Sequence, residues 1–158
     1  MEIKKHMIRD REEEIMWSGQ MIAMICMVIL AVADIREKAV PNMFLAVFGL
    51  TAVIYTAMQG EKNWLAILYS LIPGVFLLTV SLCTRESIGY GDGWAAMALG
   101  LLTGMEACLV SLGIGLALSA FVSLVLLAAH KVNGKSRLPF LPFLAIGLGV
   151  WTVVQKGI

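Results

Sequence analysis

Two aspartates are the residues of this sequence best placed for chemistry. Asp34 lies in AVADIREKAVPN and Asp92 in IGYGDGWAAMALG, each at the end of an apolar stretch. A carboxylate at the edge of a membrane span costs free energy, and such groups usually serve proton transfer or ion binding. The pair therefore predicts proton chemistry or ion handling.

The residues that follow Asp34 form a recognisable pattern. Arg36 and Lys38 come first, and Pro41 and Asn42 follow. Proline suits the first turn of a helix, so we expect the segment VPN to open the second apolar helix. A simpler interpretation of Asp34 alone is a charge at a helix end that pairs with Arg36 or Lys38.

Three glycines surround Asp92 in the segment GYGDG. Gly89, Gly91 and Gly93 permit backbone conformations closed to other residues and also the close approach of another segment. An ordinary glycine-rich loop would have the same composition. Because both motifs occur on one strongly apolar chain, their combination favours a functional site over a loop.

Other chemistries have little support in the sequence. His6 and His130 are isolated, and Cys26, Cys83 and Cys108 form neither a CxxC pair nor a group with metal-ligand spacing. We therefore expect no metal, no cofactor and no nucleophile paired with a histidine. The net charge is +1 and no basic stripe with interleaved aromatic residues occurs, so we expect no nucleic-acid partner.

The composition indicates an integral membrane protein. Hydrophobic residues make up 59% of the 158 residues and charged residues only 15%, whereas about a quarter of a soluble domain is charged. Only helices satisfy every backbone group over long apolar runs in a bilayer, so we expect an all-α bundle of six transmembrane helices. The expected spans are 15–33, 41–58, 64–83, 92–105, 108–129 and 139–155. They follow a polar tail at 1–14, and residues 15–158 would form one membrane domain.

The charges of the connections predict an orientation. The second and fourth connections and the carboxyl tail carry only Lys62 and Lys156, whereas the first, third and fifth are basic. The positive-inside rule then puts these three connections in the cytoplasm and both termini outside, although the basic residues of the amino-terminal tail oppose this orientation. Both aspartates would face the cytoplasm. The basic residues of the three connections are Arg36, Lys38, Arg85, Lys131, Lys135 and Arg137.

The fourth apolar segment is short. From Asp92 to Glu106 it has about 14 residues, or ~21 Å of helix, against ~30 Å of hydrocarbon. Asp92 is therefore expected below the membrane surface, beside a water-filled cleft. Ala96, Gly100 and Gly104 form a stripe of small residues that predicts close helix packing.

Three motifs in order resemble one known family, the type IV prepilin and preflagellin peptidases, which belong to the GxGD aspartic membrane proteases. The motifs are DIREKAVPN at 34–42, GYGD at 89–92 and the proline-rich LPFLPFLAIG at 138–147. The resemblance implies that Asp34 and Asp92 are the catalytic pair, with Gly89, Gly91, Pro41 and Asn42 completing the motifs.

Two departures from the family pattern are visible. The family commonly has a lysine two residues after its second aspartate, where this chain has Trp94. Long bacterial members carry an amino-terminal extension with paired CxxC motifs and N-methyltransferase activity, which this sequence does not contain. The chain therefore resembles the short form that has peptidase activity only.

The resemblance also implies a reaction and a substrate. One ionised carboxyl would take a proton from water while a protonated one polarises the scissile carbonyl, and closeness with partial burial raises one pKa to give this asymmetry. The substrate would be a membrane-inserted prepilin-like precursor, with a short basic leader before a hydrophobic helix. It would be cut near the cytoplasmic face of the plasma (inner) membrane. The sequence predicts neither which precursor is cut nor an oligomeric state.

Two other functions use the same aspartates. A relative of signal peptide peptidase would share GxGD, but that group typically has tyrosine before the first aspartate, and Ala33 stands there. A non-enzymatic protein, such as an ion-coupled transporter subunit or an assembly factor for a secretion system, could bind cations with the same acids. Ion transport in liposomes or cleavage of a prepilin-like substrate would discriminate between them.

Overall fold

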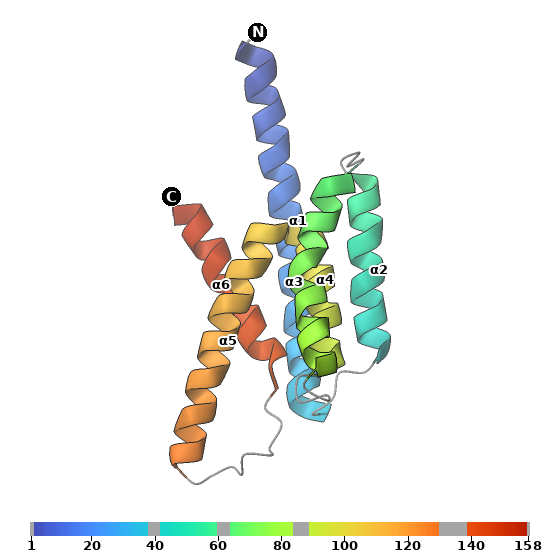
Figure 1. Ribbon diagram of the computed structural model, residues 1–158. Coiled ribbons are helices and arrows are strands. Elements are labelled where there is room, and N and C mark those ends of the chain that lie inside the picture. Colours follow the sequence, from blue (N-terminus) through green and yellow to red (C-terminus); the bar gives the residue numbers. More distant parts are fainter. Residues whose placement is uncertain (1, 38–41, 60–63, 84–88, 130–138, 158) are drawn as a thin grey trace.

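The computed structural model describes residues 2–37, 42–59, 64–83, 89–129 and 139–157, and within these ranges the regular structure is entirely helical. The six helices run alternately along the length of the molecule (Figure 1). Their number and order agree with the six apolar segments of the sequence. The bounds are α1 Glu2–Glu37, α2 Asn42–Met58, α3 Trp64–Cys83, α4 Tyr90–Thr103, α5 Met105–Ala128 and α6 Leu141–Gly157.

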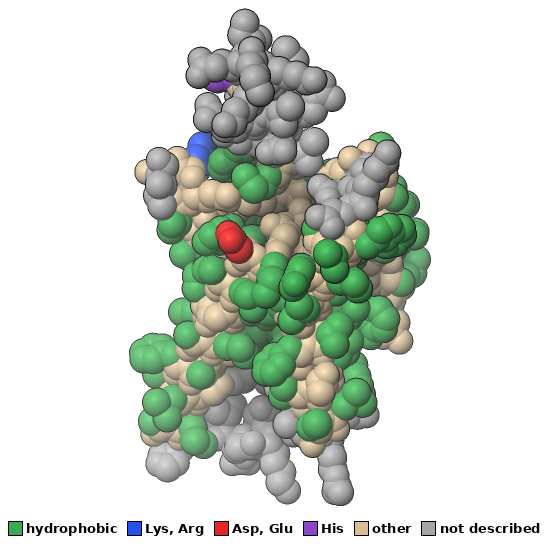
Figure 2. Space-filling view, turned by 45° about the horizontal axis from the view of Figure 1, so that its top comes forward, with side chains coloured by type: hydrophobic (Ala, Val, Ile, Leu, Met, Phe, Trp, Pro, Cys, Tyr) green, Lys and Arg blue, Asp and Glu red, His purple; other side chains and the backbone are tan. Residues whose placement is uncertain are grey.

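Within the described residues, three helices are long and apolar enough to cross a membrane. They are the Met16–Arg36 part of α1, the whole of α3 and the whole of α5. The helices α2 and α6 are apolar but have 17 residues each, and α4 has 14. Hydrophobic side chains extend along the outer surface rather than only in the core (Figure 2), as expected for a protein in contact with lipid.

The first helix is longer than the sequence predicts. The apolar pattern predicts a span from residue 15, and the apolar part of α1 does begin at Met16, but the helix itself already begins at Glu2 and continues to Glu37. Its amino-terminal part extends beyond the other helices (Figure 1). Charged residues such as Lys, Arg and Glu are good helix formers, so the polar segment can continue the helix.

The junction of α4 and α5 corrects another prediction. The sequence suggests a connection between spans ending at 105 and starting at 108, but Gly104 alone separates the two helices. Gly104 adopts φ 84°, and its N–H donates to the carbonyl of Gly100 while its carbonyl accepts from Cys108. A left-handed φ favours glycine, so Gly104 makes a turn instead of completing a packing stripe. Glu106 lies exposed in the first turn of α5.

The fourth helix lies at the centre of the bundle and contacts α1, α2, α3 and α5. The remaining small residues of its stripe do pack as expected, because Ala96 is fully buried and Gly100 faces α3. A side-chain carbon at Gly100 would collide with the carbonyl oxygen of Ser70. The two backbones can approach this closely only because position 100 has no side chain.

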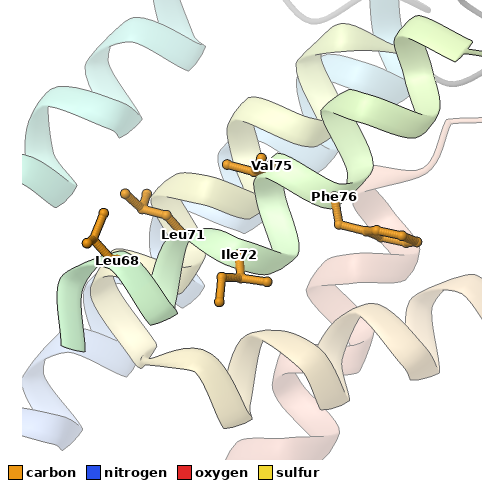
Figure 3. A pocket seen from close by; sticks show the side chains of 5 residues that line it. All are labelled: Leu68, Leu71, Ile72, Val75 and Phe76. Atoms are coloured by element: carbon orange, nitrogen blue, oxygen red, sulfur yellow. The ribbon is translucent and has the colours of Figure 1, made fainter. Parts of the chain in front are cut away.

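A shallow apolar groove follows the outer side of α3. Its lining consists of aliphatic and aromatic side chains from this one helix, and Figure 3 shows them projecting along it. None of them carries a group that can do acid–base chemistry, so this groove is not the candidate active site. The lining residues are Leu68, Leu71, Ile72, Val75 and Phe76.

Candidate active site

Asp34 lies near the carboxyl end of α1 and is only 7% exposed. Its Oδ2 accepts a hydrogen bond of 3.3 Å from the backbone N–H of Leu141, and the backbone of Phe140 also bonds to the carboxylate. Both donors belong to the start of α6. Among the described residues, Asp34 is thus bonded by backbone groups at the start of α6 and not by the side chain of Arg36, which is exposed. Lys38, the other partner expected from the sequence, lies outside the described residues.

Asp34 accepts a hydrogen bond from one of the backbone N–H groups at the start of α6. The N–H groups of Phe143 and Leu144 donate to the carbonyl of Phe140 at 3.0 and 3.1 Å. Pro142 has no N–H, and the N–H of Leu141 donates to Asp34. The first N–H groups of a helix need partners from outside the helix, and a carboxylate is a favourable one because it also interacts with the helix dipole.

Asp92 is held by the start of its own helix. Gly89 is the residue before α4, with φ −63° and ψ 134°, and its carbonyl accepts a 3.0 Å hydrogen bond from the backbone N–H of Asp92. The carboxylate of Asp92 in turn bonds to the backbone of Gly89. This reciprocal contact over three residues resembles the carboxylate half of a capping box. The spacing of GYGD therefore has a local physical cause.

The two carboxyl groups occur at the same end of the bundle. Asp34 is near the end of α1, Asp92 is in the first turn of α4, and these two helices pack against each other. The carboxyl of Asp34 lies within electrostatic range of the carboxyl of Asp92. Residues 58 positions apart are thus brought into one site, and each stands beside the positive end of a helix.

The glycines of GYGDG have different roles from one another. Gly89 adopts a φ that any residue can adopt, so it does not need the conformational freedom of glycine. Gly91 lies within the first turn of α4. Gly93 is buried, and a Cβ there would lie 2.6 Å from Cγ of Leu78 in α3. The predicted close approach of another segment is therefore found at Gly93.

Three other residues were named from the sequence: Pro41, Asn42 and Trp94. Asn42 is exposed and is the first residue of α2, so the second helix begins where the VPN segment predicts. Pro41 lies outside the described residues. Trp94 is 56% exposed and points away from the packed core. The roles of Asn42, Pro41 and Trp94 in the site stay predictions.

The charged residues of the sequence do not reveal the contribution of α6. Its donors are backbone groups of Phe140 and Leu141, which carry no chemical signature of their own. The available signal was the proline-rich segment LPFLPFLAIG, because its prolines mark a helix start. Among the residues that the structure describes, no three His, Cys, Asp or Glu side chains are grouped so that they could hold a metal ion.

The fold and the site together define a helical, apolar membrane protein with a pair of carboxyls at one end. Residues 21–129, which are 109 of the 158, match the model of the type IV leader peptidase family. The chain belongs to this family, and the family implies a peptidase. The matched range contains Asp34 and Asp92 and ends before α6. No curated protein and no solved structure gives a significant match.

Proposed function

We propose that this protein is an intramembrane aspartic endopeptidase that removes the leader peptide of type IV prepilin-like precursors. Asp34 and Asp92 are the two catalytic carboxyls and water is the nucleophile. The observation that supports this best is the pairing of Asp34 and Asp92 within electrostatic range, at one end of the bundle. Membership of the leader peptidase family supports the choice of a peptidase over an ion transporter.

The reaction needs one proton shared between the two carboxyls. The ionised carboxyl takes a proton from water, the hydroxide attacks the scissile carbonyl, and the protonated carboxyl donates to the developing oxyanion. The proton taken from water then goes to the leaving amine when the tetrahedral intermediate collapses. A helix start carries roughly half a positive charge, so the starts of α4 and α6 together offset about one negative charge. This matches a pair that holds one negative charge and one proton.

The proposed substrate is the one that the family resemblance implies, and the proposed topology would let it reach the aspartates. All six helices cross the membrane, the aspartate end faces the cytoplasm of a plasma (inner) membrane, and α4 is only 14 residues long. Asp92 would then lie below the membrane surface, where a basic leader that enters from the cytoplasm can reach it. The hydrophobic helix of the precursor would lie against the bundle through small residues.

Cleavage by the purified protein in liposomes tests this function. The substrate is a precursor with a short basic leader before a hydrophobic helix, and mass spectrometry locates the cut. We expect one cut at the leader boundary. A matched precursor whose leader lysines and arginines are replaced by glutamine should be cut more slowly. Sodium or proton flux through the same liposomes without any cleavage would contradict the proposal and favour a transporter.

Labelling tests the orientation independently. In a variant whose three cysteines are replaced by alanine, single cysteines replace Lys38, Lys135 or Lys62. A membrane-impermeant thiol reagent should reach the first two positions only from the cytoplasmic side and Lys62→Cys only from outside. The opposite pattern would place the aspartates outside.

A further inference from the structure

The helices α1 and α6 pack side by side in opposite directions with a seven-residue repeat on both. Seven residues are close to two helical turns, so residues at this spacing share one face. The middle residues of the two series, Met27 and Leu148, are fully buried. The series are Gln20, Met27 and Asp34 on α1, and Leu141, Leu148 and Gln155 on α6.

A polar contact joins the two helices at each end of this repeat. At one end Asp34 accepts from the N–H of Leu141 at 3.3 Å, and at the other Nε2 of Gln20 donates to Oε1 of Gln155 at 2.6 Å. Fourteen residues separate the two contacts on both helices, which is ~21 Å of helix. The two contacts therefore require the same axial register of α1 against α6.

The side chains that meet between these two ends can adapt their shape. Met27 and Leu148 have a thioether and a hydrocarbon side chain, and both are buried. Met24 contacts Gly149, because a Cβ added at Gly149 would lie 3.5 Å from the terminal methyl group of Met24. Methionine is flexible and fills different gaps at similar free energy. A slip of one turn, about 5.4 Å, would preserve much of this apolar contact but would move Asp34 away from the start of α6.

The glutamine pair is a poor source of net stability. Gln20 is 2% exposed, and among the described residues its Oε1 has no hydrogen-bond partner. Nε1 of Trp151, one turn before Gln155 on α6, also lacks one there. A buried polar atom without a partner costs about as much as a hydrogen bond contributes. Buried polar pairs of this kind are best attested as devices that select one helix register.

We infer that Gln20 and Gln155 are positioning residues, which fix the register of α1 against α6 and so hold Asp34 at the start of α6. This rests on the proposed function of Asp34 as a catalytic carboxyl. The pair acts at the end of the bundle opposite the aspartates. It makes no contact with the substrate in this proposal, and its effect on the reaction passes through the position of α1.

The first measurement compares kinetics and stability. The double variant Gln20→Leu/Gln155→Leu replaces the pair with apolar side chains of similar size. We expect kcat to fall about tenfold with little change in KM, because the carboxyl is misplaced while precursor binding is not. The melting temperature in detergent should not fall, because both partners of the glutamine pair are removed and neither is left buried without the other. The control is Thr152→Val, which removes a hydroxyl that donates to the carbonyl of Leu148 in its own helix.

The second measurement reads the register directly. In the cysteine-free protein, Met24→Cys is paired with Gly149→Cys, or with Ala145→Cys or Val153→Cys one turn to either side. With the glutamine pair intact, a short thiol cross-linker should join position 24 mainly to 149. In the double leucine variant, the yield of cross-linking from position 24 to 145 or to 153 should rise, and the yield to 149 should fall.

The two measurements distinguish failure of the register role from failure of its link to Asp34 and from failure of the proposed function. An unchanged cross-linking pattern in the double leucine variant would overturn the register role, whatever happens to kcat. A changed pattern with kcat equal to that of the wild type would overturn the link to Asp34. If the wild-type protein cut no leader precursor at all, the proposed function would fail instead, and the cross-linking result would still decide whether the glutamines set the register.

Discussion

The two aspartates are held in opposite ways. Asp92 bonds to Gly89, three residues away, so its position follows from the start of one helix. Asp34 bonds to the N–H of Leu141, 107 residues away, so its position exists only when α1 and α6 are packed together. The hydrogen bonds that hold Asp92 are thus local in the sequence, whereas those that hold Asp34 depend on tertiary packing. Distant changes in the bundle should therefore disturb Asp34 more than Asp92.

The largest effect is expected from removal of either carboxyl. Asp34→Asn and Asp92→Asn should each lower kcat about a thousandfold or more, because each removes one half of the acid and base pair. Both variants should remain inserted and keep their melting temperature in detergent. Glu106→Gln is the matched control, since this carboxyl is exposed in the first turn of α5. Cleavage near the wild-type rate by either asparagine variant would remove that aspartate from the mechanism.

A smaller effect is expected when the local support of Asp92 is removed. Proline can adopt the φ of −63° that is observed at Gly89. The substitution Gly89→Pro would remove the backbone N–H that donates a hydrogen bond to the carboxylate of Asp92. We expect kcat to fall about tenfold, by analogy with the loss of one hydrogen bond to a charged group. Gly89→Ala keeps the N–H and should stay within about twofold of the wild type. Equal rates for both variants would show that the bond to Gly89 has no role in catalysis.

The contact of α4 with α3 should matter mainly for stability. A Cβ at Gly93 would meet Cγ of Leu78 at 2.6 Å, whereas nothing lies within 4 Å of one at Gly113. Gly93→Ala should lower the free energy of unfolding by about 1–3 kcal/mol, and Gly113→Ala should not lower it. Denaturation in detergent measures both. If the two variants were equally stable, α4 would not need the close approach to α3.

The smallest effect is expected at Trp94, where the family commonly has lysine. Its side chain is more than half exposed, so Trp94→Lys should change the free energy of unfolding by no more than about 0.5 kcal/mol. The long lysine side chain can reach the membrane surface from this position near the aspartate end. Turnover should change less than about twofold. A large gain in kcat would show that position 94 has a charge role in this family.

The helices were largely predictable because each apolar run is bounded by polar or glycine-containing segments. The run at 64–83 has the same bounds as α3. The α4–α5 junction was predicted between residues 105 and 108, whereas the turn lies at Gly104 alone, because it depends on the φ of that residue. The start of the first apolar span agrees with the prediction, but α1 itself extends further toward the amino terminus, since charged residues can extend a helix.

The sequence by itself determined the two aspartates, their common end and the local geometry of Asp92. These follow from the order of apolar runs and from contacts over three residues, which need no other part of the chain. Only the tertiary structure decided what holds Asp34, because its donors are backbone groups of α6 and every residue except proline has such a group. The same is true of the hydrogen bond between Gln20 and Gln155, which joins α1 and α6 at the opposite end of the molecule.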